Sequence, residues 1–86
     1  DLAIVAAVAS SFLDKPLPEG TMVLGEVGLT GEVRAIGQVD TRISESRKMG
    51  FTRCLFPASN LKRLRAIKGI EIMGVKTVSE AVENLF

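Results

Sequence analysis

Residues 24–37 read LGEVGLTGEVRAIG, and this stretch decides the fold. Apolar β-formers alternate here with polar residues and are punctuated by glycines, which is typical of two short strands joined by a tight turn. We expect one strand over residues 22–27, a turn over residues 28–31 and a second strand over residues 32–36. The sequence therefore predicts a β-hairpin in the first half of the chain.

The segment before this hairpin is apolar or small on nearly every side and ends at Asp14-Lys15-Pro16. Such a pattern predicts a helix that is buried on most of its surface. Its large apolar residues are Leu2, Ile4, Val5, Val8, Phe12 and Leu13.

After the hairpin, Asp40 or Thr41 can cap a helix that turns Ile43 and Met49 inward and ends at Gly50, which can take the left-handed conformation. Residues 51–56 then read as a short buried strand that Pro57 terminates.

Ser59 or Asn60 is expected to cap the next amphipathic helix, which Gly69 closes. Its apolar stripe consists of Leu61, Leu64 and Ile67. Residues 70–75 form another strand, and Thr77 and Glu80 make a capping box for a last helix. The order predicts an α/β fold, with an α+β mixed sheet of about four strands and four helices.

Length and composition limit the domain organisation. With 86 residues the chain can form a single domain, residues 1–86, and its start inside an apolar segment without Met suggests an N-terminally truncated fragment of a larger chain. No apolar run approaches the roughly 20 residues that a membrane span needs. The single cysteine and the absence of histidine argue against a disulfide or a zinc site, and we expect a reducing, cytoplasmic location.

Several pieces occur in the order and spacing of a known family. Residues 24–37 resemble the hairpin of Lon-type protease domains, and the closer match is the RadA (Sms) group of Lon-like domains. The further matching pieces are residues 42–46, Gly50-Phe51, Pro57 and residues 74–78. The resemblance implies a Lon proteolytic-domain-like fold, of the kind also described as ribosomal protein S5 domain 2-like.

The resemblance also bears on catalysis. Lon proteases use a serine nucleophile and a lysine base, and the lysine position matches Asp40 here, where a carboxylate cannot act as an amine base. The serine position would precede Asp1. The absence of histidine removes the commonest general base as well. We expect no catalytic residues in this domain, although a Lon-type serine peptidase remains an alternative.

Charge is unevenly distributed along the chain. Residues 40–68 hold eight Lys and Arg against Asp40 and Glu45, although the net charge of the whole chain is +1. Such a basic segment can attract a phosphate backbone, or it can be a solvated face in an oligomerisation-only module. No aromatic residues are interleaved for base stacking. The candidate DNA-binding residues are Arg34, Arg42, Arg47, Lys48, Lys62, Arg63, Arg65 and Lys68.

The RadA resemblance implies a larger ATP-dependent DNA repair and recombination protein that acts on single-stranded or branched DNA. It implies self-association into a ring, a hexamer, with ATP, Mg²⁺ and Zn²⁺ bound by upstream domains. For this domain we expect no cofactor, no metal and no membrane contact, and the role of a scaffold that touches DNA.

Overall fold

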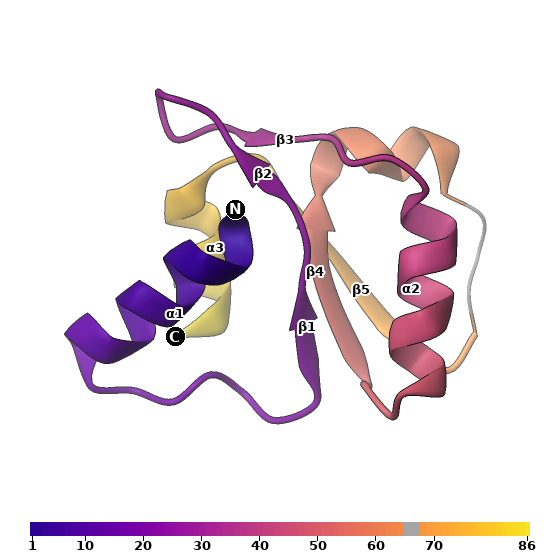
Figure 1. Cartoon of the computed structure of the whole chain (residues 1–86), viewed down its shortest axis with the longest axis horizontal. Coiled ribbons are helices and arrows are strands. Elements are labelled where there is room, and N and C mark those ends of the chain that lie inside the picture. The colour runs from indigo at the N-terminus through magenta and orange to yellow at the C-terminus, as the bar shows by residue number, and fades with distance from the viewer. Residues whose placement is uncertain (65–67) are drawn as a thin grey trace.

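A computed structural model covers the whole chain and describes residues 1–64 and 68–86, apart from the side chain of Arg63. The elements in order are α1 (Leu2–Leu13), β1 (Thr21–Val23), β2 (Glu26–Val27), β3 (Val33–Arg34), α2 (Val39–Lys48), β4 (Arg53–Pro57), the 3₁₀ helix η1 (Ala58–Arg63), β5 (Glu71–Val75) and α3 (Val78–Leu85). A parallel sheet has the order β1-β4-β5, and β2 pairs with β3 in an antiparallel hairpin. Figure 1 shows α1 and α3 on one side of the parallel sheet and α2 on the other. The predicted α/β class is confirmed.

The central strand β4 divides the core into two clusters, because successive strand residues point to opposite faces of a sheet. Leu55 joins the cluster on the α1 and α3 side, which includes Leu2. Cys54 and Phe56 join the cluster on the α2 side, which includes Ile43. A strand buried on both faces explains the continuous apolar run that the sequence shows here.

The predicted strand over residues 22–27 is split between the two sheets. Leu24 still bonds to β4, with its N–H 2.8 Å from the Leu55 carbonyl oxygen, but Gly25 turns the chain with a φ of 149°. A Cβ at Gly25 would lie 3.1 Å from Val33 Cγ1 and 3.3 Å from Leu2 Cδ2. The hairpin is therefore confirmed but shorter than predicted, because a close approach of three segments breaks its first strand.

The prediction that α1 is buried on most of its surface is wrong. The helix buries Leu2 and Ala6, whereas Ile4, Val8 and Phe12 are 63%, 64% and 87% exposed. The parallel sheet has only three strands, and α1 shares one face of it with α3. The sheet therefore covers only one side of α1. An apolar stripe at a spacing of four residues consequently faces solvent in this chain.

Helix α2 begins at Val39, two residues earlier than a cap at Asp40 would place it, so neither Asp40 nor Thr41 is its N-cap. Gln38 occupies that position in the left-handed conformation, with a φ of 54° and no side-chain capping bond. Ile43 is fully buried, as predicted, but Met49 is 72% exposed because it follows the last helical turn. Gly50 takes the predicted left-handed conformation, with a φ of 99°.

The segment after Pro57 is a short 3₁₀ helix instead of the predicted amphipathic α-helix. Pro57 is its N-cap, with no side-chain capping bond, so the predicted caps Ser59 and Asn60 are wrong. Leu61 is 50% exposed, Leu64 packs on the α2-side cluster, and Ile67 lies outside the described residues. Together with the three α-helices, η1 accounts for the four helices expected.

The last helix begins as predicted. The Thr77 hydroxyl oxygen accepts a hydrogen bond from the Glu80 N–H at 3.1 Å, and Ala81 and Leu85 are buried. Within the described part of the chain, no helix combines the length and the apolar character that a membrane crossing requires.

Candidate functional site

Asp40, the position that matches the Lon lysine, lies in the first turn of α2. It borders a pocket of about 310 Å³ together with Ile36, Gly37 and Asn60. Its Oδ1 atom is buried and, among the described residues, has no hydrogen-bond partner. A carboxylate in a first helical turn is favoured by the helix dipole. Its position is thus electrostatically suited to an acid.

A second pocket, of about 180 Å³, lies where the start of α1, the end of β1 and the residues before α2 meet. Its ionisable lining residues are Asp1, Glu26 and Arg42. Neither pocket is lined by a lysine, serine, cysteine or histidine of the described residues. These surroundings do not bring together the nucleophile and base that acyl transfer needs.

Cys54 is the one thiol of the sequence and is 1% exposed on β4. Burial raises the pKa of this thiol to about 11, so it stays protonated at neutral pH. Because the thiolate is the reactive form, Cys54 acts as a core side chain.

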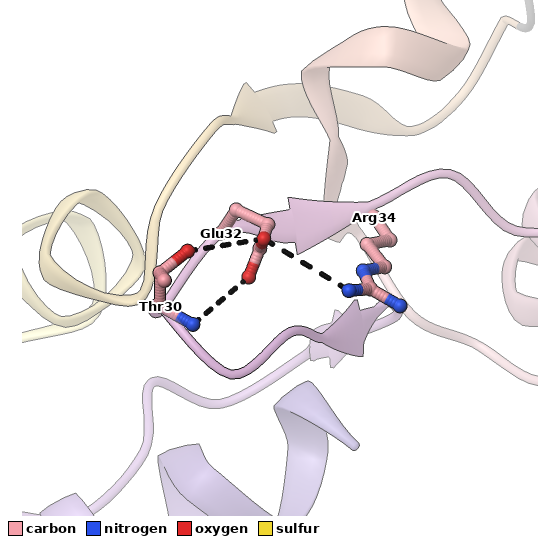
Figure 2. A network of polar contacts seen from close by, with 3 residues as sticks. All are labelled: Thr30, Glu32 and Arg34. Atoms are coloured by element: carbon pink, nitrogen blue, oxygen red, sulfur yellow. Dashed lines mark hydrogen bonds and ion pairs between the residues drawn. The ribbon is translucent and has the colours of Figure 1, made fainter.

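The β2–β3 hairpin carries a network of polar contacts at its turn (Figure 2). Glu32 accepts hydrogen bonds from the Thr30 backbone N–H at 3.2 Å and from the Thr30 hydroxyl at 3.1 Å. Bonds from its own backbone N–H and from the Thr30 hydroxyl lower the pKa of Glu32. Gly28 lies so close that an added Cβ would overlap the Glu32 carboxylate. This clamped turn presents Leu29 with its side chain fully exposed.

Arg34, a candidate DNA-binding residue, lies on this hairpin. Its Nη2 atom is 4.0 Å from Glu32 Oε2, and its side chain is 61% exposed. An exposed pair at this distance contributes little to stability but reduces the net positive charge that Arg34 presents. The cation on the hairpin is therefore accompanied by an exposed carboxylate.

The remaining described candidates lie on the α2 side, on the helix itself or near one of its two ends. Arg47 and Lys68 come together, because Arg47 Nη1 donates to the Lys68 carbonyl oxygen at 3.0 Å. Figure 1 shows residues 68–70 near the C-terminal end of α2. The 3₁₀ helix η1, which carries Lys62, lies near the N-terminal end of α2. Arg42 lies on α2 between these groups. The side chain of Arg63 and all of Arg65 lie outside the described structure.

Arg53 belongs to the basic segment but is engaged in the fold. Its Nε atom is 3.7 Å from Glu71 Oε2, and its Nη2 atom is 3.2 Å from the Met73 sulfur. Nε is also buried without a hydrogen bond, so the contact with Glu71 is an ion pair at longer range. Arg53 therefore joins β4 to β5.

Asn60 positions the loop that leads into α2, a role that the sequence did not reveal. It is 5% exposed, and its side-chain amide donates to the Ile36 carbonyl oxygen and accepts from the Ile36 N–H, both at 3.0 Å. The amide imitates a strand neighbour and ties η1 to residues 36–38. An asparagine three residues after a strand-ending proline carries no pattern that would predict this bond.

Comparison with known proteins identifies the family to which this fold belongs. The family model of the Lon protease (S16) C-terminal proteolytic domain matches residues 1–86. The chain is 49% identical over 84 residues to the DNA repair protein RadA of Bacillus subtilis (strain 168), which covers 98% of this chain and 18% of that protein. It is 46% identical over 82 residues to the DNA repair protein RadA of Escherichia coli (strain K12), covering 95% and 18%.

A third relative is the DNA repair protein RadA of Streptococcus pyogenes serotype M3 (strain ATCC BAA-595 / MGAS315), which is 41% identical over 86 residues, covering 100% of this chain and 19% of the relative. The chain thus spans about a fifth of the length of the relatives that it matches. Because the family model covers every residue of this α/β fold, the chain belongs to the Lon protease (S16) C-terminal proteolytic domain family.

Proposed function

We propose that this chain is a non-catalytic scaffold and DNA-contacting domain of a RadA-type repair protein that acts on branched DNA. The observation that carries the proposal is the charge of α2. An acid, Asp40, stands at the position that matches the Lon base, while exposed cations follow along the same helix and in the segments beside it. The relatives named RadA are DNA repair proteins, which supports a polyanion as the partner of these cations.

In this proposal, peptide hydrolysis is absent because Asp40 cannot accept a proton from serine as an amine base would. The test is digestion of casein by the full-length protein. We expect no cleavage, and cleavage that Asp40→Asn abolishes would overturn the non-catalytic assignment.

DNA contact is tested by reversing the described cations of the α2 side. We expect the full-length protein with Arg42→Glu, Lys48→Glu, Lys62→Glu and Lys68→Glu to bind labelled oligo-dT more weakly and with a shallower salt dependence than the unchanged protein. Equal affinity and equal salt slope would remove DNA contact from this domain.

The wider setting is part of the same proposal. The domain would serve a cytoplasmic protein that assembles into a ring, a hexamer, and whose other domains bind ATP, Mg²⁺ and Zn²⁺. Weak contacts from each domain would then add up around one DNA molecule. The described residues hold no group of three or more side chains placed to bind a metal ion.

The second candidate function is an oligomerisation-only module. The exposed stripe of Ile4, Val8 and Phe12 on α1 favours it, since contiguous apolar surface often marks a protein contact. Sedimentation of the full-length protein with Val8→Ser and Phe12→Ser tests it. A smaller assembly with unchanged DNA affinity per chain would support this module.

A further inference from the structure

The outer face of α1 has the relief of a surface on which another helix packs. Ile4, Val8 and Phe12 are exposed at a spacing of four residues, so they form one ridge of large apolar side chains along the helix. A row of small side chains is exposed beside this ridge and consists of Ala3, Ala7 and Ser11. A ridge next to a shallow groove is what the side chains of a second helix interlock with. The face therefore matches a helical partner in shape.

Carboxylates stand at both ends of this ridge. Asp1 caps α1, and its Oδ1 atom accepts a hydrogen bond from the Ile4 N–H at 3.0 Å. Asp14 is the C-cap, lies two residues after Phe12 and is exposed. The helix dipole adds negative partial charge at this C-terminal end, and no cation lies in the last turn, so the end stays negative despite Lys15, which follows it. Both ends of the ridge therefore attract cations.

Helix α3 packs beside α1 on the same side of the sheet and extends the negative charge (Figure 1). It carries Glu80 and Glu83, and neither α1 nor α3 contains a lysine or an arginine. On the other side of the sheet, by contrast, α2 carries Arg42, Arg47 and Lys48. The layer of α1 and α3 therefore combines exposed apolar side chains with negative charge.

We propose that the outer face of α1 binds a helical segment of another protein, a segment with an apolar stripe flanked by lysine or arginine. The stripe would cover Ile4, Val8 and Phe12, as in other complexes where an amphipathic helix docks by its apolar face. The flanking cations would meet the carboxylates at the ends of α1 and on α3. This proposal goes beyond DNA contact and does not depend on it.

Two other occupants match this face less well. Two identical α1 faces would bring like carboxylates together, and the basic α2 face of a second copy offers Met49 at the end of the helix but no apolar stripe along it. An anionic membrane surface would be repelled by the same carboxylates. Charge complementarity therefore favours a cationic helix.

The experiment measures fluorescence anisotropy with the full-length protein and two labelled peptides. One peptide is an amphipathic helix built from leucine and lysine, and the other is a scrambled peptide of the same composition that lacks an apolar stripe. We expect the amphipathic peptide to bind with a Kd roughly tenfold lower than the scrambled one. Equal affinity for the two peptides would overturn the proposal, because charge alone would then explain the binding.

Variants of the full-length protein locate the binding of the amphipathic peptide. Val8→Ser with Phe12→Ser should raise Kd about tenfold, because it removes most of the exposed ridge. Leu29→Ser with Met49→Ser is the matched control, which removes two exposed apolar side chains elsewhere and should change Kd less than about twofold. Thermal unfolding of each variant is measured alongside. Equal values of Kd for the two double variants would overturn the proposal.

The charge of the site is tested with neutral isosteres. Glu80→Gln with Glu83→Gln should raise the Kd of the amphipathic peptide about threefold and weaken its salt dependence. Glu26→Gln with Glu45→Gln removes two exposed carboxylates outside α1 and α3 and should leave Kd unchanged. The same Kd for both pairs would contradict the cationic character of the partner.

Sedimentation of the same variants separates a foreign helix from a second copy. The proposal expects Val8→Ser with Phe12→Ser to leave the assembly of the full-length protein unchanged. A smaller assembly would mean that a second copy covers α1, and the proposal would then be wrong. All these variants keep the cations of α2, so their outcome does not decide whether the domain contacts DNA.

Discussion

The two faces of the parallel sheet end in different surfaces. On one face α2 buries Ile43 completely and presents charged side chains such as Lys48 to solvent. On the other face α1 buries Ala6 but leaves Val8 and Phe12 exposed. The outer surface of α2 is charged, as is usual for a surface in contact with water, whereas the outer surface of α1 is apolar, as is usual for a surface that contacts another protein. A large apolar side chain therefore has a different energetic value on each face, as Ile43 and Ile4 illustrate.

The largest expected effect comes from shortening one isoleucine on each face. Ile43→Ala should lower the free energy of unfolding by roughly 2–5 kcal/mol, because it leaves a cavity in the α2-side core. Ile4→Ala, at a position 63% exposed, should change it by no more than about 0.5 kcal/mol. Urea denaturation of the same protein measures both. Similar losses for the two variants would contradict the difference between the faces.

The next effect concerns the bond that seats α2. Asn60→Ala should cost roughly 1–3 kcal/mol, since it leaves the N–H and C=O of Ile36 without their partner in a partly buried place. Asn84→Ala is the control on the α3 side, where an exposed amide donates to the Glu80 carbonyl oxygen at 2.7 Å. The control should stay within about 0.5 kcal/mol. Equal chemical-denaturation midpoints for the two variants would show that Asn60 is dispensable.

Smaller effects on stability, one negative and one positive, are expected at the N-termini of α3 and α2. Thr77→Ala removes the cap of α3 and should destabilise by about 1 kcal/mol. Gln38→Gly at the start of α2 should stabilise by up to about 1 kcal/mol, because Gln38 has a φ of 54° and no side-chain capping bond. Differential scanning calorimetry gives both signs. Destabilisation by Gln38→Gly would mean that its side chain has an undescribed stabilising role.

The smallest effect is a pH dependence in the hairpin. The lowered pKa of Glu32 means that its contribution to stability is present above the ordinary value of 4.5 and is lost as pH falls through the lower folded value. Glu32→Gln should therefore reduce Tm slightly at neutral pH, and the gap between the two proteins should close in acid. A gap that persists or widens in acid would contradict the contribution of the ionised carboxylate.

The sequence predicted several features that depend on local chemistry, although it misplaced the N-caps of α2 and η1. The hairpin, the buried strand around Cys54, the Thr77 cap and the left-handed Gly50 all follow from residue type and spacing. The family itself was evident from the order of its short motifs, and the family model confirms it.

Features that depend on packing between distant segments were missed. The break at Gly25 requires the approach of Leu2 and Val33, and the exposure of α1 depends on how many strands lie beneath it. The bond from Arg47 to Lys68 joins residues 21 positions apart. The charge of the basic segment, residues 40–68, could be counted from the sequence, but the arrangement of its side chains required the fold to be known. The DNA-contacting role of the candidate cations stays a prediction.

The clamped turn at the hairpin tip lowers the conformational entropy that would be lost if another protein bound Leu29. The Gly28 N–H bonds to the Glu32 carbonyl oxygen at 2.9 Å, the Gly31 N–H to Gly28 at 3.1 Å, and the Val78 N–H to Gly31 at 2.9 Å. With its backbone restrained on both sides, Leu29 has little main-chain freedom left to lose on association. A protein surface that covers this leucine would thus gain most of the hydrophobic free energy of its burial, without first having to order the loop that presents it.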